Sequence, residues 1–340
     1  MTNIRFFVGL DIGSEQFVAT IGTTPWRVVA RATPFANSAD GFQALLDWLQ
    51  QHDCAPSQTI LCMEATGVYG EALAYYVVVH HWPLAVEPPL KVKRAFATHG
   101  HKTDAVDSQQ IAEYACRFVD ELTRWQPRAE VLEQITVLLT TREQFTVQRT
   151  AHLNALTALK RKPVHTPVAE LAHEQAVAQL KAHLQTIEAE IKRLIDREPP
   201  FQHLVGLWLT IPGIGIPLAA YLLVLRFTAT RPLDAKWVSA YLGMCPYERQ
   251  SGKSVRGTPT SRHFGPRIPR KLLHLAARSV STHKPAFREY YQRKVDEGKP
   301  KKLALNNVAN KLLKIICAVA TAQTPYDANY VSAKPSLKGA

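Results

Sequence analysis

The sequence predicts an α/β domain with a mixed central sheet, a long helical hairpin, and a mainly α-helical C-terminal domain. Short apolar runs alternate with turns and amphipathic segments at the start of the chain. Two long apolar stripes with helical spacing follow, and helical patterns dominate the remainder. We therefore place domains at residues 1–125, 126–199 and 200–325, followed by a flexible tail at 326–340.

The first domain begins with a strand hairpin. The run FFVGLDI is apolar and ends at a glycine, as expected for a buried strand, and two more strands follow after short turns. Strands then alternate with helices, which indicates a mixed sheet. The expected strands are Phe6–Ile12, Phe17–Ile21, Arg27–Ala32, Gln58–Glu64 and Pro83–Glu87, and the expected helices are Gly41–Gln51, Val68–His80 and Ala105–Phe118.

The second domain is a pair of long helices. Apolar residues recur at spacings of three and four from Leu132 to Leu159 and from Leu171 to Leu194. Prolines within Lys160–Pro167 separate the two stripes, and Pro199–Pro200 ends the second. The hairpin is either a spacer or a dimerisation arm.

The excess positive charge lies in one C-terminal stretch. The chain of 340 residues has a net charge of +13, with 41 Lys and Arg and 28 Asp and Glu. Residues 245–314 hold 17 of the basic and 4 of the acidic residues, and the rest of the chain holds 24 of each. This stretch is either a solvated face or, as the interleaved Gly, Ser and Thr favour, a phosphate-binding surface.

The cysteines and apolar runs indicate a cytoplasmic protein without a membrane segment. Five cysteines are scattered without a CxxC pair, which argues against disulfides and a zinc ribbon. No signal-peptide pattern precedes Phe7, and the apolar run Leu218–Leu225 is too short to span a bilayer.

Four acids form the first candidate site. Asp11 and Glu64 each end a buried strand, and Asp104 and Asp107 begin a helix on one face. Such carboxylates, if they converge, need a cation, and one or two Mg²⁺ ions prefer oxygen ligands. Alone, Asp104 could be a helix cap and Asp11 a turn former. The set, on the first strand, a later strand and a late helix, is the layout of the RNase H-like nuclease fold.

Two further segments could bind nucleic acid. In IPGIG, Gly213 and Gly215 precede a helix, as in a helix-hairpin-helix module that grips phosphate, or in an ordinary turn between core helices. We expect a loop from Gly243 to Pro259, rich in Gly, Ser and Arg. Within this loop, Ser251 and Ser254 are either phosphate ligands or nucleophiles. The candidate cationic contacts are Lys253, Arg256, Arg262, Arg267, Arg270 and Lys271.

The motifs GLDIG, MEATGVYG, KTDAVDSQ, IPGIG, AYLGMCP and SGKSVRG occur in an order and spacing that closely resemble the insertion sequence one-ten (IS110) transposases. The resemblance runs from about residue 6 to about residue 320. It implies a RuvC-like N-terminal domain in which Asp11, Glu64, Asp104 and Asp107 coordinate Mg²⁺. It also implies a C-terminal transposase domain in which Ser251 attacks DNA and forms a covalent link.

The resemblance further implies partners. These are donor and target DNA, a structured bridge or seeker RNA that selects them by base pairing, and a second copy of the chain. Dimers would assemble into tetramers in which the serine of one subunit completes the acidic site of another, in a bacterial or archaeal cytoplasm near the nucleoid. The segment after the serine loop departs from the family's usual Lys-x-Gly-Asn-x-x-Leu-Arg run, and Pro269 is expected to delay or bend the next helix.

Three functions therefore stand as hypotheses. The first is an RNA-guided transposase that cuts and rejoins DNA through a serine with Mg²⁺. The second is a metal-dependent nuclease or Holliday-junction resolvase in which water attacks and no covalent intermediate forms. The third is a non-catalytic DNA- or RNA-binding protein, against which the presence of all four acids and the serine argues.

Overall fold

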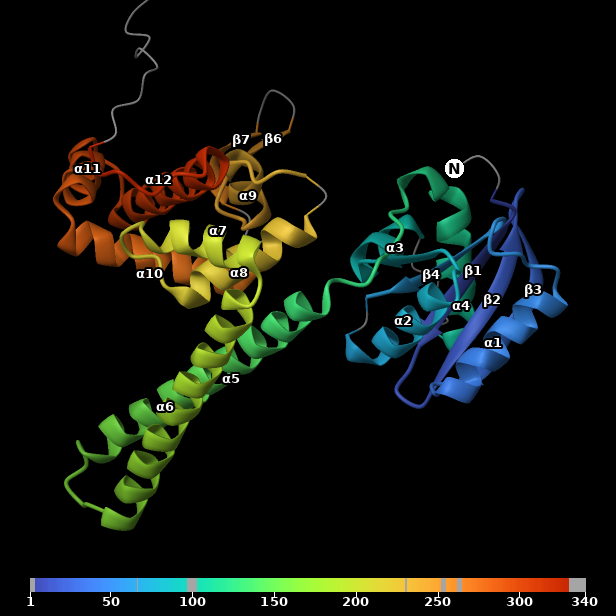
Figure 1. The fold of residues 1–340 in the computed structure, drawn as a ribbon, viewed down its shortest axis with the longest axis horizontal. Helices are drawn as coiled ribbons and strands as arrows, with labels where there is room; N and C mark the ends of the chain where they lie inside the picture. The colour runs from blue at the N-terminus through green and yellow to red at the C-terminus, as the bar shows by residue number, and fades with distance from the viewer. Residues whose placement is uncertain are drawn as a thin grey trace, which may run out of the picture. The chain divides into compact units, whose positions relative to one another are not determined.

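The chain forms two compact units, Met1–Pro127 and Arg128–Ala340 (Figure 1). The computed structural model describes residues 4–65, 67–96, 103–229, 231–251, 255–261 and 265–329. The expected tail at 326–340 lies outside these ranges after residue 329. The expected boundary between arm and C-terminal domain, at residue 199, falls inside the second unit.

A five-stranded mixed sheet forms the centre of the first unit. Its strands are β1 (Phe6–Ile12), β2 (Gln16–Thr23), β3 (Arg27–Ala36), β4 (Thr59–Glu64) and β5 (Leu84–Glu87), in the order β3-β2-β1-β4-β5. The first three pair antiparallel, whereas β4 runs parallel to β1 and β5 parallel to β4. This strand order confirms the predicted RNase H-like fold, with every predicted strand present.

Helices cover both faces of this sheet. The helices α1 (Ala39–Gln51) and α2 (Glu71–Val79), with the 3₁₀ turn Val68–Gly70, pack on one face, and α3 (Pro89–Ala95), α4 (Asp104–Arg117) and the turn Val119–Glu121 on the other. Because side chains alternate along a strand, Val8 and Leu10 face α1 and α2. Phe7, Ile60 and Cys62 face α4. This alternation determines the face on which each strand-end acid lies.

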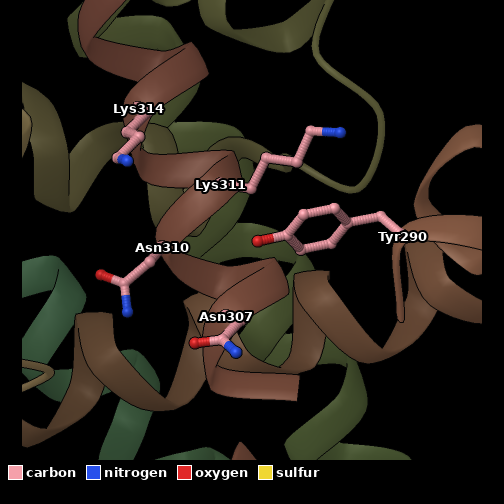
Figure 2. Close-up of a pocket in the computed structure, with 5 residues that line it drawn as sticks. All are labelled: Tyr290, Asn307, Asn310, Lys311 and Lys314. Carbon is pink, nitrogen blue, oxygen red and sulfur yellow. The ribbon is translucent and has the colours of Figure 1, made fainter. Parts of the chain in front are cut away.

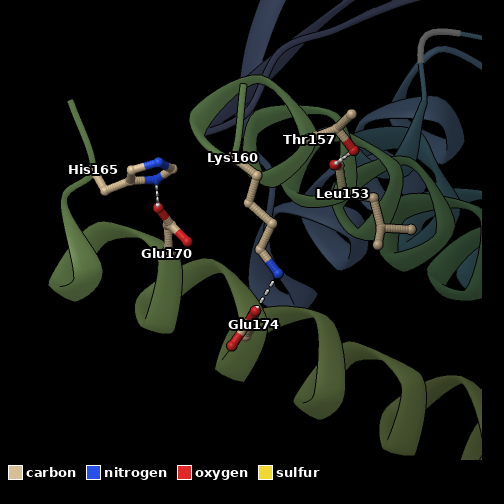
Figure 3. A network of polar contacts seen from close by, with 6 residues as sticks. All are labelled: Leu153, Thr157, Lys160, His165, Glu170 and Glu174. Atoms are coloured by element: carbon tan, nitrogen blue, oxygen red, sulfur yellow. Dashed lines mark hydrogen bonds and ion pairs between the residues drawn. The ribbon is translucent and has the colours of Figure 1, made fainter. Parts of the chain in front are cut away.

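The arm consists of α5 (Glu130–Leu159) and α6 (Pro167–Asp196), which confirms the predicted helical hairpin. Only the base of the arm is buried, where its apolar residues pack into the core of the second unit. The buried residues are Leu132, Ile135, Leu139, Ile191, Leu194 and Ile195. Polar contacts join the helices near the turn, including an ion pair of 2.7 Å between Lys160 Nζ and Glu174 Oε1 (Figure 3). Both side chains are about half exposed, so water screens their attraction and the pair contributes little to the stability of the arm.

Six helices and a hairpin complete the second unit. The helices are α7 (Pro199–Leu209), α8 (Ile216–Thr228), α9 (Ala235–Tyr241), α10 (Arg267–His283), α11 (Pro285–Asp296) and α12 (Lys301–Ala322). Trp208 is fully buried, and its Nε1 donates a hydrogen bond of 3.1 Å to the carbonyl of Ile316.

By length and composition alone, α12 could cross a membrane, and it is the one such helix among the described residues. In this fold its apolar side is core, since Val308, Leu312 and Ile316 are fully buried against the other helices of the unit. The apolar composition of α12 is therefore explained by its burial in the core of the second unit.

Two local expectations were wrong. The expected loop is a two-stranded antiparallel hairpin, β6 (Pro246–Ser251) and β7 (Val255–Ser261), because Val255, Thr258 and Thr260 suit a strand despite the glycines and charges around them. Pro269 neither delays nor bends the next helix. It lies in the first turn of α10, where a backbone N–H has no intrahelical partner.

Candidate active site

Asp11 and Glu64 end two neighbouring parallel strands. The register pairs Leu10 with Met63, so the next residues, Asp11 and Glu64, occupy matching positions at the same sheet edge. Both are partly buried. Since Phe7 and Cys62 face α4, strand alternation places both acids on the face that α4 covers.

Gly9 lets α4 approach β1 at backbone contact. A Cβ at this position would lie 2.0 Å from the carbonyl oxygen of Ser108 and 2.3 Å from the backbone nitrogen of Ala112. No side chain fits between the strand and the helix here. The glycine of GLDIG, two residues before Asp11, therefore sets the spacing between the sheet and α4.

Two contacts give the direction of α4. The hydroxyls of Ser108 and Thr20 are 2.8 Å apart, and the Cys116 thiol lies 4.0 Å from the carbonyl of Thr23. In the β1–β2 register, Thr20 pairs with Gly9, and Thr23 pairs with the first residue of β1. The helix therefore runs antiparallel to β1, with its N-terminal end toward the edge that carries the first acid pair.

The second acid pair lies in the first turn of α4. Thr103 is the N-cap, since its hydroxyl accepts a hydrogen bond of 3.3 Å from the backbone N–H of Val106. The alternative that Asp104 serves only as the cap is therefore wrong. Asp104 is exposed and Asp107 is partly buried. Negative charge in this turn is stabilised by the helix dipole.

The strand-end acids thus lie at one edge and on one face of the sheet, and the helix that begins with the other two acids covers that face with its N-terminal end toward that edge. Their donor atoms are carboxylate oxygens, the ligands that a hard divalent cation such as Mg²⁺ takes. Among the described residues, however, no three His, Cys, Asp or Glu side chains gather closely enough to hold a metal ion. The acids therefore suit such a cation in their donor chemistry, while their side chains are not drawn together into a metal site among the described residues.

A fifth carboxylate at this edge was missed by the sequence reasoning. Glu87 ends β5, pairs in register with Glu64, and is only 5% exposed. Its carboxylate lies 3.1 Å from Lys91 Nζ, and the nearby Tyr114 hydroxyl and then the Glu87 carboxylate, which accepts from the ammonium group, raise the pKa of that lysine. Lys91 compensates the buried charge. The sequence pattern that predicted Asp11 also applies to Glu87, because both acids end an apolar strand.

Ser251 is the last residue of β6 and pairs with Val255 across the hairpin. Lys253 and Ser254, which come between these two residues in the sequence, lie outside the described residues, as does Arg262. The choice between Ser251 and Ser254 as nucleophile therefore stays open.

The base of this hairpin is attached to α12. Asn306 Nδ2 donates a hydrogen bond of 3.3 Å to the carbonyl of Met244, and Ser239 Oγ donates one of 2.6 Å to Asn310 Oδ1. The Cys245 thiol in turn lies 3.2 Å from Ser239 Oγ. These contacts attach the residues just before β6 to α9 and α12, which form a platform at the base of the serine strand.

The remaining predicted contact residues occupy different surroundings. Arg270 Nη1 donates a hydrogen bond of 3.0 Å to the carbonyl of Leu242, and Lys271 Nζ is 2.5 Å from Glu143 Oε1 on α5. Both therefore have structural partners. Arg267 is exposed at the start of α10, and Arg256 belongs to β7.

The two glycines of IPGIG lie in the turn between α7 and α8. Gly213 has φ +81°, and a Cβ there would lie 2.9 Å from Val280 Cγ1 on α10. Gly215 precedes α8 as its N-cap, and both glycines are exposed. The turn is therefore required by packing, while its surface remains accessible.

Comparison with known proteins identifies the family. One model, of the DEDD transposases of IS110 and described as "Transposase", matches residues 8–161, and another, "Transposase IS116/IS110/IS902 family", matches residues 206–292. The pilin gene-inverting protein of Moraxella bovis is 30% identical over 327 residues, which cover 95% of this chain and 98% of that protein. The chain belongs to the IS110 family of transposases.

The comparisons found further likenesses. The pilin gene-inverting protein of Moraxella lacunata is 29% identical over the same share of both chains. The structure titled "T. thermophilus RuvC in complex with Holliday junction substrate" is 13% identical, covers 36% of this chain and 99% of that one, and has a TM-score of 0.27.

Membership in the IS110 family makes this protein a transposase, an enzyme of DNA recombination. The first matched segment of the IS110 transposase contains all four acids and α5. The second contains the serine hairpin and runs from α7 into α11. The four candidate acids and the candidate serine therefore each lie within a segment matched to the family.

Proposed function

We propose that this transposase cuts and rejoins DNA through Ser251, with one or two Mg²⁺ ions held by Asp11, Glu64, Asp104 and Asp107. The observation that carries the proposal is that Asp11 and Glu64 end neighbouring strands at one edge of the sheet, on the face covered by α4, whose first turn contains Asp104 and Asp107. All four lie within the segment matched to the family. A second support is the hairpin that presents Ser251 from a platform fixed by α12.

The serine reaction conserves the number of phosphodiester-type bonds. The Ser251 oxygen forms a bond to phosphorus and releases its proton to solvent. The bond from phosphorus to the leaving deoxyribose oxygen breaks, and that oxygen takes up a proton and leaves as a hydroxyl. The reverse attack by a deoxyribose hydroxyl restores the DNA backbone and releases the serine, so rejoining needs no outside energy source. Bound Mg²⁺ would stabilise the negative charge that develops on the phosphate oxygens.

We propose that a structured guide RNA selects the donor and target DNA, and that the chain acts as a dimer that assembles into a tetramer in the cytoplasm. The net positive charge of residues 245–314 suits the phosphates of both nucleic acids. Along the arm, Val147, Val168 and Leu171 are 57%, 80% and 54% exposed, which supports the arm as the surface where two copies meet. We propose that a second copy completes the site, since the acids and the serine lie in different units of the chain.

A denaturing-gel assay tests the chemistry. The protein, the flanking transcript of its element, Mg²⁺ and labelled donor DNA would be mixed, with Ser251→Ala, Ser254→Ala and Asp11→Asn beside the wild type. Ser261→Ala, at the other end of the hairpin, is the matched control. We expect a slow-migrating protein–DNA adduct that is lost in Ser251→Ala, in Asp11→Asn and on chelation, and kept in Ser261→Ala.

Other results would select a different function. Cleaved DNA without an adduct, unchanged in Ser251→Ala, would mean a water-using nuclease or resolvase. An adduct lost only in Ser254→Ala would move the nucleophile to that residue. Binding without cleavage under any divalent metal would mean a non-catalytic nucleic-acid-binding protein. Because the Moraxella bovis relative is named a pilin gene-inverting protein, site-specific inversion is a second candidate reaction, and a substrate with two facing sites would report it.

A further inference from the structure

A pocket of about 370 Å³ lies between α11 and α12 in the C-terminal unit (Figure 2). Its lining residues are Tyr290 on α11 and, on α12, Asn307, Asn310, Lys311 and Lys314. The α12 residues are spaced by three, four and seven, so they share one face of that helix. Two of the lining residues are cationic and none is acidic, so the pocket has a net positive charge.

Lys311 is a partly buried cation without a carboxylate partner. Its Nζ lies 4.6 Å from the centroid of the Tyr290 ring and 5.5 Å from that of Phe287. Within the described part of the chain no acidic side chain forms an ion pair with it. Burial and then the charge of Arg293 lower its pKa. An anion in this pocket would compensate a charge that the protein leaves unbalanced.

The two asparagine side chains of the pocket differ in their hydrogen bonds. Asn310 is held in place, since its Oδ1 accepts from Ser239 and its Nδ2 donates 3.1 Å to the carbonyl of Asn306. Asn307 makes no hydrogen bond within the described residues, so its Nδ2 can donate to a ligand in the pocket. The pocket therefore combines two positive charges with one available N–H donor.

We propose that this pocket binds one phosphodiester group of a nucleic acid strand, with Lys311 and Lys314 supplying the charge and Asn307 a hydrogen bond. A phosphate oxygen accepts from ammonium and amide donors alike. The identity of the polyanion rests on the proposed function; the anion site itself rests on the pocket. Because Asn310 also accepts the hydrogen bond from Ser239, the strand would contact the same helix that holds the base of the serine hairpin.

The test compares Lys311→Gln with Lys302→Gln. Lys302 is an exposed lysine on the same helix that does not line the pocket, so both variants lose one charge from α12. We expect Lys311→Gln to weaken binding of a labelled duplex or transcript by about three- to tenfold, and to reduce the slope of log affinity against log salt by about one. Lys302→Gln should change neither, and Lys311→Arg should restore binding.

Thermal unfolding of each variant would show that the fold is kept. Wild-type affinity and slope in Lys311→Gln, or equal losses in both glutamine variants, would overturn the pocket assignment. Acylation of Lys311, read by mass spectrometry, should fall when DNA or RNA is bound. Equal protection by the same concentration of inorganic phosphate would mean a free-phosphate site and overturn the phosphodiester assignment. If the wild type forms no adduct while Lys311→Gln still loses affinity, the proposed serine chemistry fails and the pocket stands.

Discussion

Replacement of Gly9 by alanine should separate α4 from the sheet and inactivate the acidic site. The new Cβ would lie 2.0 Å from the carbonyl oxygen of Ser108 and 2.3 Å from the nitrogen of Ala112, both backbone atoms that cannot rotate away. Real Cβ atoms stay beyond 3.0 Å from such neighbours, so α4 must retreat by at least about 1 Å. Overpacking of this kind costs about 1–3 kcal/mol, occasionally more.

The same shift carries Asp104 and Asp107 away from the strand-end acids. A misplacement of about 1 Å at a reacting centre can lower a rate by about 10²-fold. We therefore expect Gly9→Ala to lower the free energy of unfolding of the first unit by about 1–3 kcal/mol. We expect it to lower the rate of adduct formation by about 10²-fold.

Chemical denaturation and the adduct assay measure these two effects. Gly206→Ala is the matched control, because this glycine lies in α7 and a Cβ there meets nothing within 4 Å. Alanine in a helix interior should leave activity unchanged and stabilise the protein by up to about 1 kcal/mol. Wild-type stability together with wild-type activity in Gly9→Ala would refute the close packing of α4 on β1.

Three further predictions concern the two cores. Ser108→Ala removes the partner of the Thr20 hydroxyl, and Thr20 is 1% exposed. The variant should lower the free energy of unfolding, measured by chemical denaturation, by about 1–3 kcal/mol. Adding Thr20→Val should recover part of that loss. Trp208→Phe removes the donor to the carbonyl of Ile316, and should destabilise the second unit by about 1–3 kcal/mol. Burial raises the pKa of the Cys54 thiol from 9.0 to about 11. The folded state therefore keeps this proton longer than the unfolded state, and stability should fall as pH rises from about 9 to about 11. The Cys54→Ala variant should lose less stability than the wild type over that range.

Each of these predictions has a contradicting outcome. A double variant at Ser108 and Thr20 whose loss equals the sum of the single losses would mean that the two hydroxyls do not interact. An unchanged unfolding midpoint in Trp208→Phe would mean that the indole N–H contributes nothing. Parallel pH profiles for Cys54→Ala and the wild type would mean that this thiol titrates alike in both states.

Much of the fold follows from local patterns. The strand FFVGLDI and the alternation of later strands with helices fixed the order of elements in the first unit, because burial on both faces demands continuous apolar runs. The long stripes of the arm were equally clear, because helix periodicity persists over many turns. The serine hairpin was misjudged because glycines and charges in residues 246–261 resemble a loop, and only cross-strand pairing makes them strands.

The sequence by itself determined which acids are candidates and on which elements they lie, because a carboxylate ending an apolar strand is visible in one dimension. Only the tertiary structure decided that Asp11, Glu64 and the start of α4 share one face and one edge, since parallel register and helix direction join residues distant in the chain. It also decided that Glu87 is compensated by Lys91. The pocket around Lys311 depends on the packing of α11 on α12, which no sequence spacing specifies.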